Sequence, residues 1–453
     1  MYVCGPTVYD EPHIGHLRSA YVFDMIRRYL EYSGYKVAFV RNVTDVDDKI
    51  IDKAKESNSA DLIEEVKKIS GKYYDAYKAD LTKLGIKEPT TEPFATRHIE
   101  EMVFLIQKLL EKGAAYQSEG DVYYSVQTFG GYGKLSNQKK DSMLEHVRID
   151  ANEKKKDPLD FALWKKAKEG EPAWDSPWGK GRPGWHLECS AMSMKYLGES
   201  FDIHGGGLDL IFPHHENEIA QSEAATGKPF VKCWIHHGLV TREGHKMSKS
   251  LHNYLTLKAA IKDIEIDARK EALKLMFLNT HYRAPLDYTE ERISMEKTIW
   301  KRFFNLYLFA DQLKVIHKYN KPKNSGQYPR IREILDHIIQ AMNDDFNTPA
   351  AITGLHEMLH YAWKSNDANI ILAVAKEIKE LTSKLFSLNF DLFHELVGEI
   401  SRGKIDTLIK ERKEARLAKN YIKSDDIRKI LDDNRIALMD LKDGITLWCL
   451  KID

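Results

Sequence analysis

Residues 2–40 contain two short β-prone runs separated by one long helical pattern. The first run, residues 2–4, ends at a Gly-Pro turn, and the second covers residues 37–40. Between them, residues 17–32 repeat apolar side chains at helical spacing, and Gly34 marks the expected helix end. A strand, a helix and a second strand in this order predict a βαβ unit with a right-handed crossover. We therefore expect an α/β fold on a parallel sheet, with ligands beyond the carboxyl ends of its strands.

Two short polar motifs frame the first half of the chain. His-Ile-Gly-His at residues 13–16 falls at the expected helix start, and Lys-Met-Ser-Lys-Ser at residues 246–250 follows a polar stretch with Gly244 as a possible hinge. Either motif alone occurs more often as a surface loop. Imidazoles at a helix N-terminus can face a phosphate together with backbone N–H groups, and mobile lysines can close on it. The ordered pair beside a βαβ unit thus favours a nucleotide site.

In this order and at this separation, the two motifs resemble the ATP-handling motifs of class I aminoacyl-tRNA synthetases. Within that class the chain resembles cysteinyl-tRNA synthetases along nearly its whole length. The matching stretches are Tyr2–Asp10, Arg41–Lys49, Pro183–Met192, Asp202–Gly207 and Pro213–Glu218. The resemblance implies attack of an amino-acid carboxylate on the α-phosphate of ATP, and transfer of cysteine to the terminal adenosine of tRNA-Cys.

The ATP site is expected to use five residues from the two motifs. We assign His13 and His16 to the phosphates and the transition state, because that reaction needs mainly positioning and electrostatic stabilisation. Gly15 lacks a side chain, so adenine can approach the backbone closely. Lys249 is assigned to the leaving pyrophosphate with Lys246 assisting, and Mg²⁺ is expected to accompany ATP.

A metal site is suggested by His214 and Glu218, which are four residues apart and share a helix face. A polar helix start without metal is the alternative on spacing alone. The resemblance implies one zinc ion held by Cys4, Cys189, His214 and Glu218, with a further bond to the substrate thiolate. Zinc binds sulfur far better than a hydroxyl, so cysteine would be separated from serine without an editing activity.

The resemblance also implies the residues around the substrates. Thr44, Trp185 and His204 are expected to line the cysteine pocket, and Asp209 is expected to bind the ATP ribose. The alternatives are a turn cap for Thr44, core packing for Trp185 and a spacer in a glycine loop for His204. Two further thiols, Cys233 near His236 and Cys449 in the C-terminal tail, are expected to be structural, with Cys233 buried.

Changes of pattern divide the chain into segments. Residues 255–431 look almost wholly helical, and residues 436–450 are β-prone with Gly444 at the turn. We expect a Rossmann-type catalytic domain over 1–90 and 184–254, split by a connective insertion over 91–183. Linker helices over 255–330, a helical tRNA-binding domain over 331–400 and a C-terminal anticodon-side subdomain over 401–453 are expected to follow.

Composition fits this interpretation. The 453 residues are 43% hydrophobic and 30% charged, with four scattered cysteines, no apparent signal peptide and no apolar segment long enough for a bilayer. We expect a cytoplasmic protein, monomeric by default, without a membrane partner. Net charge is zero, so tRNA needs a local basic surface. Residues 402–429 offer ten Lys/Arg against five Asp/Glu, and Trp448 is a candidate for base stacking.

Two departures from the resembled family stand out. Its members carry a segment before the strand that leads to Cys4, whereas this chain starts almost at the strand, so we expect Cys4 to be held less rigidly. The lysine motif is usually followed by Leu-Gly-Asn, and His252 replaces that glycine. Altered loop closure is expected, with a larger effect on rate than on specificity.

Two other functions remain open at this point. One is a related ligase that joins cysteine to an amino sugar, which would lack the anticodon-reaching tail. The other is an inactive tRNA- or zinc-binding regulator on the same fold. The helical C-terminal half argues against the first, and the intact histidine, lysine and metal-ligand residues argue against the second.

Overall fold

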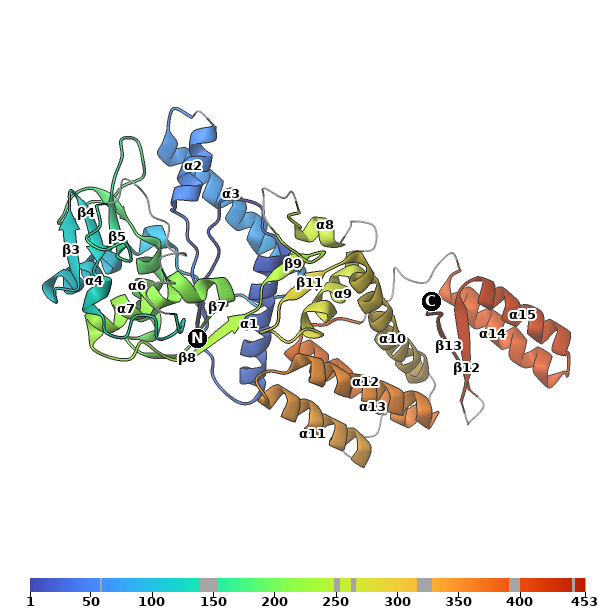
Figure 1. The fold of residues 1–453 in the computed structure, drawn as a ribbon. Coiled ribbons are helices and arrows are strands. Elements are labelled where there is room, and N and C mark those ends of the chain that lie inside the picture. Colours follow the sequence, from blue (N-terminus) through green and yellow to red (C-terminus); the bar gives the residue numbers. More distant parts are fainter. Residues whose placement is uncertain are drawn as a thin grey trace. The chain divides into compact units, whose positions relative to one another are not determined.

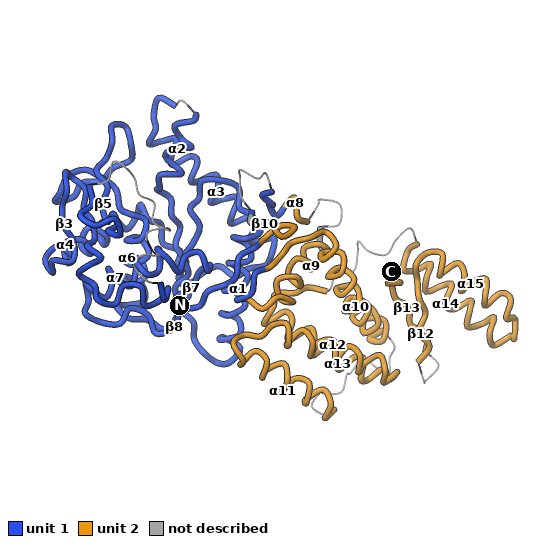
Figure 2. Tube along the Cα trace, in the orientation of Figure 1, with its two compact units in different colours: residues 1–240, 246–257, 283–285 blue, residues 241–245, 258–282, 286–453 orange. Residues whose placement is uncertain are grey.

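The structure is a computed structural model that describes residues 1–57, 59–138, 143, 154–247, 253–261, 266–315, 328–390, 400–441 and 445–452. The chain forms two compact units, which Figure 2 colours separately. Unit 1 comprises residues 1–240, 246–257 and 283–285, and unit 2 comprises residues 241–245, 258–282 and 286–453. Within the described residues, every helix is too short or too polar to cross a bilayer.

Unit 1 is built on a four-stranded parallel sheet in the order β2-β1-β7-β8, of which β7 and β8 are labelled in Figure 1. The strands are β1 (Tyr2–Val3), β2 (Val40–Arg41), β7 (Phe201–Gly207) and β8 (Val231–His237). Tyr2 of β1 pairs with Val40 on one side and His204 on the other. The predicted parallel sheet is therefore confirmed, although its second strand starts at Val40 rather than at residue 37. The residues that follow each strand gather at the carboxyl edge.

Helix α1 (Ile14–Tyr32) forms the crossover between β1 and β2. Its buried face is largely apolar and includes Leu17, Phe23 and Ile26, each fully buried. The helix ends at Ser33, and Gly34 follows with a φ of 92°, a conformation that costs a glycine little. Burial of this stripe holds the start of α1 against the carboxyl edge of the sheet.

A second sheet of unit 1 is antiparallel, in the order β3-β4-β5-β6. Its strands are β3 (Ala115–Ser118), β4 (Asp121–Tyr124), β5 (Phe161–Lys166) and β6 (Gly181–Pro183). One apolar core joins this sheet to neighbouring helices, with Trp164, Met102, Leu187 and Ala220 among its buried members. The remaining helical elements of the unit are α2 (Asp48–Glu56), α3 (Leu62–Lys83), η1 (Ala95–Arg97), α4 (Ile99–Glu111), η2 (Val126–Thr128), α6 (Trp185–Leu197), η4 (Leu208–Leu210), η5 (Ile211–His215) and α7 (Glu216–Thr226).

Unit 2 is mostly helical. Its long helices are α9 (Ile266–Leu278), α10 (Glu290–Val315), α11 (Pro329–Asn343), α12 (Thr348–Ser365), α13 (Ala368–Leu385), α14 (Arg402–Leu417) and α15 (Tyr421–Asp433), after the short α8 (Leu257–Ile261). A small sheet in the order β10-β9-β11 comprises β10 (His245–Lys246), β9 (Val240–Arg242) and β11 (Leu286–Tyr288). The chain ends in the antiparallel pair β12 (Ile436–Asp440) and β13 (Thr446–Leu450), as predicted.

Strand β13 is fastened to helix α10 by two side-chain amides. The amide of Asn305 donates to the backbone oxygen of Leu450 (2.9 Å) and accepts from its N–H (3.1 Å). Two turns further along the same face of α10, Gln312 makes the same pair of bonds with Trp448 (2.8 and 3.0 Å). These bonds satisfy backbone groups on the β13 edge that β12 leaves open.

Candidate active site and metal centre

The two histidines of the first motif occupy the N-terminus of α1. Their rings stack at 3.8 Å between centroids with 20° between their planes. His13 Nδ1 accepts a hydrogen bond from the Gly15 N–H (3.0 Å), and His16 Nδ1 accepts one from the His13 N–H (3.4 Å). Because Nδ1 is the acceptor in both rings, a neutral ring carries its proton on Nε2. Each imidazole can therefore donate from Nε2 beside the positive end of the helix.

His16 is held neutral. Burial lowers its pKa to about 3, with further contributions from His13 and Lys49. A neutral imidazole donates one hydrogen bond without competing with the helix terminus for positive charge. The arrangement suits a phosphate oxygen, because donors are fixed in place before a ligand arrives.

Gly15 has a structural reason to lack a side chain. A Cβ at this position would lie 2.7 Å from Cε1 and 2.8 Å from Nδ1 of His13. Any larger residue would therefore displace the ring of His13 that caps the helix. The sequence analysis assigned Gly15 to close approach of adenine, and this collision is an additional constraint.

The second motif lies beside the first. The end of the Met247 side chain would be 3.7 Å from a Cβ on Gly15. Beyond the motif, the Ile14 N–H donates to Leu255 (2.9 Å), and the Tyr254 ring meets His13 edge-on at 4.7 Å. Lys246 is in β10, and its side chain, Lys249 and His252 lie outside the described residues.

Four potential metal ligands converge from four separate segments. Cys4 follows β1, Cys189 is in α6, His214 is in η5 and Glu218 is in α7. Their ligand atoms all lie within 4.8 Å of one another. Cys4 Sγ is 3.7 Å from both Cys189 Sγ and Glu218 Oε1, and His214 Nε2 is 3.0 Å from Glu218 Oε1. The fold thus brings together side chains that are up to 214 residues apart in the sequence.

These separations fit a zinc ion. Tetrahedral zinc with bonds of about 2.3 Å to sulfur and about 2.0 Å to nitrogen or oxygen spaces its ligand atoms by roughly 3.3–3.8 Å. His214 Nε2 is buried and makes no in-line hydrogen bond within the described part of the chain. Its Nδ1 is held by His186 Nδ1 at 2.9 Å, which turns Nε2 toward the other three ligands.

A second set of donors shares two of these residues. Cys4, His204, His215 and Glu218 also lie within ligand range of one another. However, His204 Nε2 bonds to Glu218 Oε2 (2.8 Å), and His215 Nδ1 bonds to His236 Nε2 (2.8 Å). The first set has two thiols, which soft metals prefer, whereas the second set has one. We therefore treat His204 and His215 as surrounding residues.

Charge is already separated among the four ligands. Burial opposes ionisation of Glu218, yet the neighbouring His204 and His214 lower its pKa to about 2. Against burial, Glu218 and Cys189 raise the pKa of His214 to about 10. Burial also opposes ionisation of Cys189, but its hydrogen bond with Cys4 and the nearby His214 lower its pKa to about 6. Burial and the partner thiol raise the pKa of Cys4, so one thiolate is favoured over two. Such a cluster is ready to exchange its protons for a cation.

Comparison with known proteins identifies the family. Residues 1–298 match the family described as tRNA synthetases class I (C) catalytic domain, and residues 337–391 match the DALR domain. A cysteine–tRNA ligase of Thermodesulfovibrio yellowstonii is 46% identical over 100% of this chain and 95% of its own length. Those of Aquifex aeolicus (43%) and Geobacillus thermodenitrificans (46%) align over 99% of this chain and 94% of their own lengths.

The chain belongs to the cysteine–tRNA ligase family.

Solved structures agree at the level of the fold. Methionyl-tRNA synthetase of Mycobacterium tuberculosis matches with a TM-score of 0.65 at 14% identity, over 89% of this chain and 94% of that one. A leucyl-tRNA synthetase of Agrobacterium radiobacter matches with a TM-score of 0.61 at 10% identity, over 85% and 84%. The class I catalytic fold with a helical C-terminal half is thereby confirmed. Because the cysteine–tRNA ligase match extends through the C-terminal half, the amino-sugar alternative loses its structural basis.

The residues predicted around the substrates differ in their surroundings. Trp185 is 38% exposed and stacks on His214 at 4.1 Å. Thr44 is buried, donates to Glu188 Oε2 (2.9 Å) and accepts from Asn42 Nδ2 (3.3 Å). His204 is fully buried and contacts the metal ligands through Glu218. Asp209 is exposed in η4, directly after β7.

Residues that the sequence analysis missed support the site from behind. The buried carboxylate of Glu216 accepts from the N–H groups of Gly133 (2.9 Å), Leu135 (3.4 Å) and Ser136 (2.8 Å). Asn42 Oδ1 accepts from the Gly5 N–H (2.8 Å) and lies 3.8 Å from Cys189 Sγ. Sequence position could have pointed to both residues. Glu216 lies between the candidate ligands His214 and Glu218, and Asn42 lies within the matching stretch Arg41–Lys49.

Two predictions about other residues are wrong. Cys233 is exposed near the start of the edge strand β8 rather than buried, and burial along this strand begins only at Ile235. Trp448 is only 1% exposed and donates to Asp406 (3.2 Å), so it cannot stack on a base. Exposed apolar and aromatic side chains on α14 and α15 include Leu417, Tyr421 and Ile422.

Proposed function

We propose that the chain activates L-cysteine with ATP to cysteinyl-adenylate and then transfers cysteine to the 3′-terminal adenosine of tRNA-Cys. Family membership over the full chain supports the reaction. The observation that carries the choice of amino acid is the cluster of Cys4, Cys189, His214 and Glu218 in unit 1.

These four side chains would hold one zinc ion. Bound zinc supplies a Lewis-acid site that prefers a thiolate sulfur to a hydroxyl oxygen. The chain's own part is to fix the four ligands in advance through the bonds of His186 to His214 and of His204 to Glu218. Since an ordinary pocket separates cysteine from serine poorly, sulfur selection makes editing unnecessary.

His13 and His16 would bind the triphosphate and stabilise the charge that develops on the α-phosphate. Their Nε2 donors and the α1 N-terminus supply three fixed sources of positive potential. Lys249 and Lys246 would neutralise the leaving pyrophosphate, with Mg²⁺ bound to ATP. Gly15 and Asp209 would meet the adenosine.

The substrate amino acid would lie against the exposed face of Trp185. The Trp185 ring stacks on His214, so the wall of the pocket is in direct contact with the proposed metal site. Thr44 is oriented by Glu188 to accept from the ammonium group, and His204 acts by orienting Glu218. Substrate carboxylate and α-phosphate would meet between this pocket and the start of α1.

The helical domain and the C-terminal subdomain would bind tRNA. The domain boundaries proposed from sequence, at residues 90, 183, 254, 330 and 400, define the parts for deletion experiments. We further propose a monomer acting in a reducing cytoplasm, consistent with four cysteines that are all free thiols.

The direct test is aminoacylation of a tRNA-Cys transcript with labelled cysteine. The proposal predicts alkali-labile attachment of cysteine to tRNA-Cys but not to tRNA-Ser, and no attachment of serine. Attachment to an amino sugar, or cysteine activation without transfer to tRNA, would contradict it.

A further inference from the structure

A concave site of about 530 Å³ lies in unit 2 between α10 and α12. His356, His360 and Trp363 line it from one face of α12, since they are four and three residues apart. Arg302 lines it from α10, and Ile299, Leu359 and Ile452 provide apolar surface. A single small ligand of mixed character fits sites of roughly 300–1,000 Å³.

The aromatic side of this groove is fixed before any ligand binds. The His356 ring packs on Phe303 at 5.1 Å, and the Trp363 indole meets Phe309 edge-on at 5.0 Å. Ile452 is held at the rim because Leu450, two residues earlier, is bonded to Asn305 of α10. A preformed flat surface lowers the entropic cost of binding a planar ring.

The charge around the groove is not neutralised. Arg302 is exposed and, within the described residues, it has no carboxylate partner, and the same holds for the adjacent Lys301. By contrast, Arg330 on α11 is paired with Glu333 (2.8 Å) and with Glu357 of α12 (3.8 Å). A free guanidinium beside a fixed indole is suited to a phosphate attached to an aromatic base.

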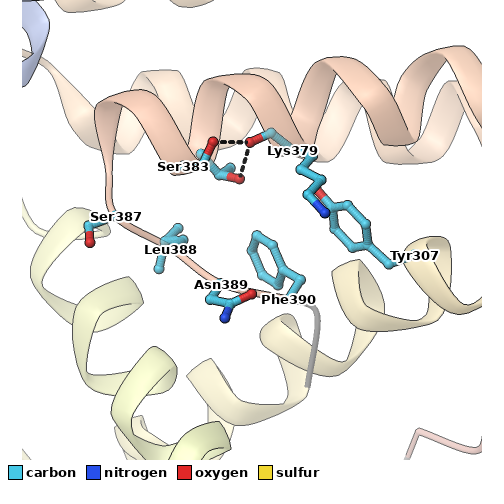
Figure 3. Close-up of a pocket in the computed structure, with 8 residues that line it drawn as sticks. Tyr307, Lys379, Ser383, Ser387, Leu388, Asn389 and Phe390 are labelled. Atoms are coloured by element: carbon cyan, nitrogen blue, oxygen red, sulfur yellow. Dashed lines mark hydrogen bonds between the residues drawn. The ribbon is translucent and has the colours of Figure 1, made fainter. Parts of the chain in front are cut away.

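A second cavity in the described part of unit 2 lacks this combination. It holds about 230 Å³ beside the end of α13, and Figure 3 shows its lining. Its hydroxyls are used internally, since Ser383 donates to the Lys379 oxygen (2.7 Å) and Thr382 donates to Ile378 (2.7 Å). The groove between α10 and α12 is therefore the stronger candidate for a ligand.

We propose that the α10–α12 groove binds one unstacked nucleotide of an RNA, with the base against Trp363 and His356 and the phosphate on Arg302. This inference rests on the proposed function in one respect, because the tRNA substrate supplies the RNA. It adds a contact for a single nucleotide in unit 2, separate from the residues that carry the chemistry.

Equilibrium binding of a tRNA-Cys transcript to the full chain tests the site. Arg302→Gln should weaken binding about fivefold and reduce the slope of log affinity against log salt by about 0.7, as for one lost phosphate contact. Trp363→Ala should weaken binding about tenfold, while Trp363→Phe retains most of the affinity through ring stacking. The matched control Arg330→Gln removes a cation that acids already neutralise, and should leave the affinity unchanged.

Cysteine-dependent ATP–pyrophosphate exchange, measured on each variant, should equal that of the unsubstituted chain. Failure of exchange in the unsubstituted chain would refute the proposed function. The tRNA affinities of the Arg302 and Trp363 variants test the groove separately. A photo-crosslink from 4-thiouridine in the transcript to residues 356–363 is expected. If the variants bind tRNA as tightly as the unsubstituted chain does, and AMP or UMP binds at the groove, the groove is a site for a free nucleotide and the RNA proposal is overturned. Equal affinities with no mononucleotide binding would overturn a nucleotide site altogether.

Discussion

His214 Nε2 and Glu218 Oε1 lie 3.0 Å apart without an in-line hydrogen bond between them. Each residue is fixed from its other side, His214 by His186 and Glu218 by His204. Both ligand atoms are thereby directed to the space that the two thiols also face. This relationship supports the proposed metal site, and it generates the first prediction.

His214→Ala should weaken zinc binding far more than His215→Ala. The first variant removes a ligand, whereas the second removes a surrounding residue, a change that costs about 10–100-fold in metal affinity. Competition with a chromophoric chelator measures both affinities. Cys233→Ser is the matched control, because that thiol is exposed on β8. The reverse order of the two histidines would select the alternative set with His204 and His215.

Gly15→Ala should lower the rate of cysteine-dependent exchange about 10–100-fold, because a Cβ would displace His13 from its position at the helix start. Gly71→Ala in α3 meets open space and should leave exchange unchanged while raising stability by about 0.5–1 kcal/mol. Steady-state exchange and thermal unfolding of both variants test this. An active Gly15→Ala variant would show that the His13 position is not critical.

Glu216→Ala should reduce the free energy of unfolding by about 3 kcal/mol, because three backbone N–H groups lose a buried carboxylate. Cleavage by protease within residues 131–138 should become faster. Chemical denaturation and limited proteolysis measure the two effects, with the exposed Glu111→Ala as control. Unchanged cleavage would mean that the loop is held by other contacts.

Stability should fall with pH below about 6.5. Burial lowers the pKa of His16 to about 3 and that of His237 to about 4. Between these values and the unfolded pKa near 6.5, the unfolded chain binds protons that the folded chain rejects, so acid favours unfolding. Each histidine contributes up to ~1.4 kcal/mol per pH unit in this window. His237→Gln should flatten the loss of stability between pH 6.5 and 4.5, measured by denaturant unfolding. An identical pH dependence in the variant would refute the assignment.

The sequence predicted the parts of the molecule that depend on local pattern. The βαβ unit, the helix over 17–32 and the final hairpin follow from apolar periodicity and glycine stops, and the structure has them with shifts of up to three residues. The four ligands came from resemblance rather than from pattern, since only His214 and Glu218 are close in sequence. Convergence of Cys4 and Cys189 depends on strand order, which local pattern does not encode.

Other features could not be derived from local pattern because they depend on tertiary contacts. Cys233 lies in the exposed first part of a strand whose later residues are buried, and β8 is an edge strand of its sheet. Trp448 is buried because α10 captures its strand through Gln312. The bond from His186 to His214 links residues 28 positions apart and becomes visible only when α6 and η5 are packed together.

The central claim is that the metal site selects cysteine by its sulfur. Amino-acid-dependent ATP–pyrophosphate exchange, with cysteine and serine compared before chelation, after chelation and after zinc is restored, tests it most directly. The account predicts exchange with cysteine alone, its loss on chelation and its recovery with zinc. Exchange with cysteine that survives metal removal, at an unchanged preference over serine, would contradict it.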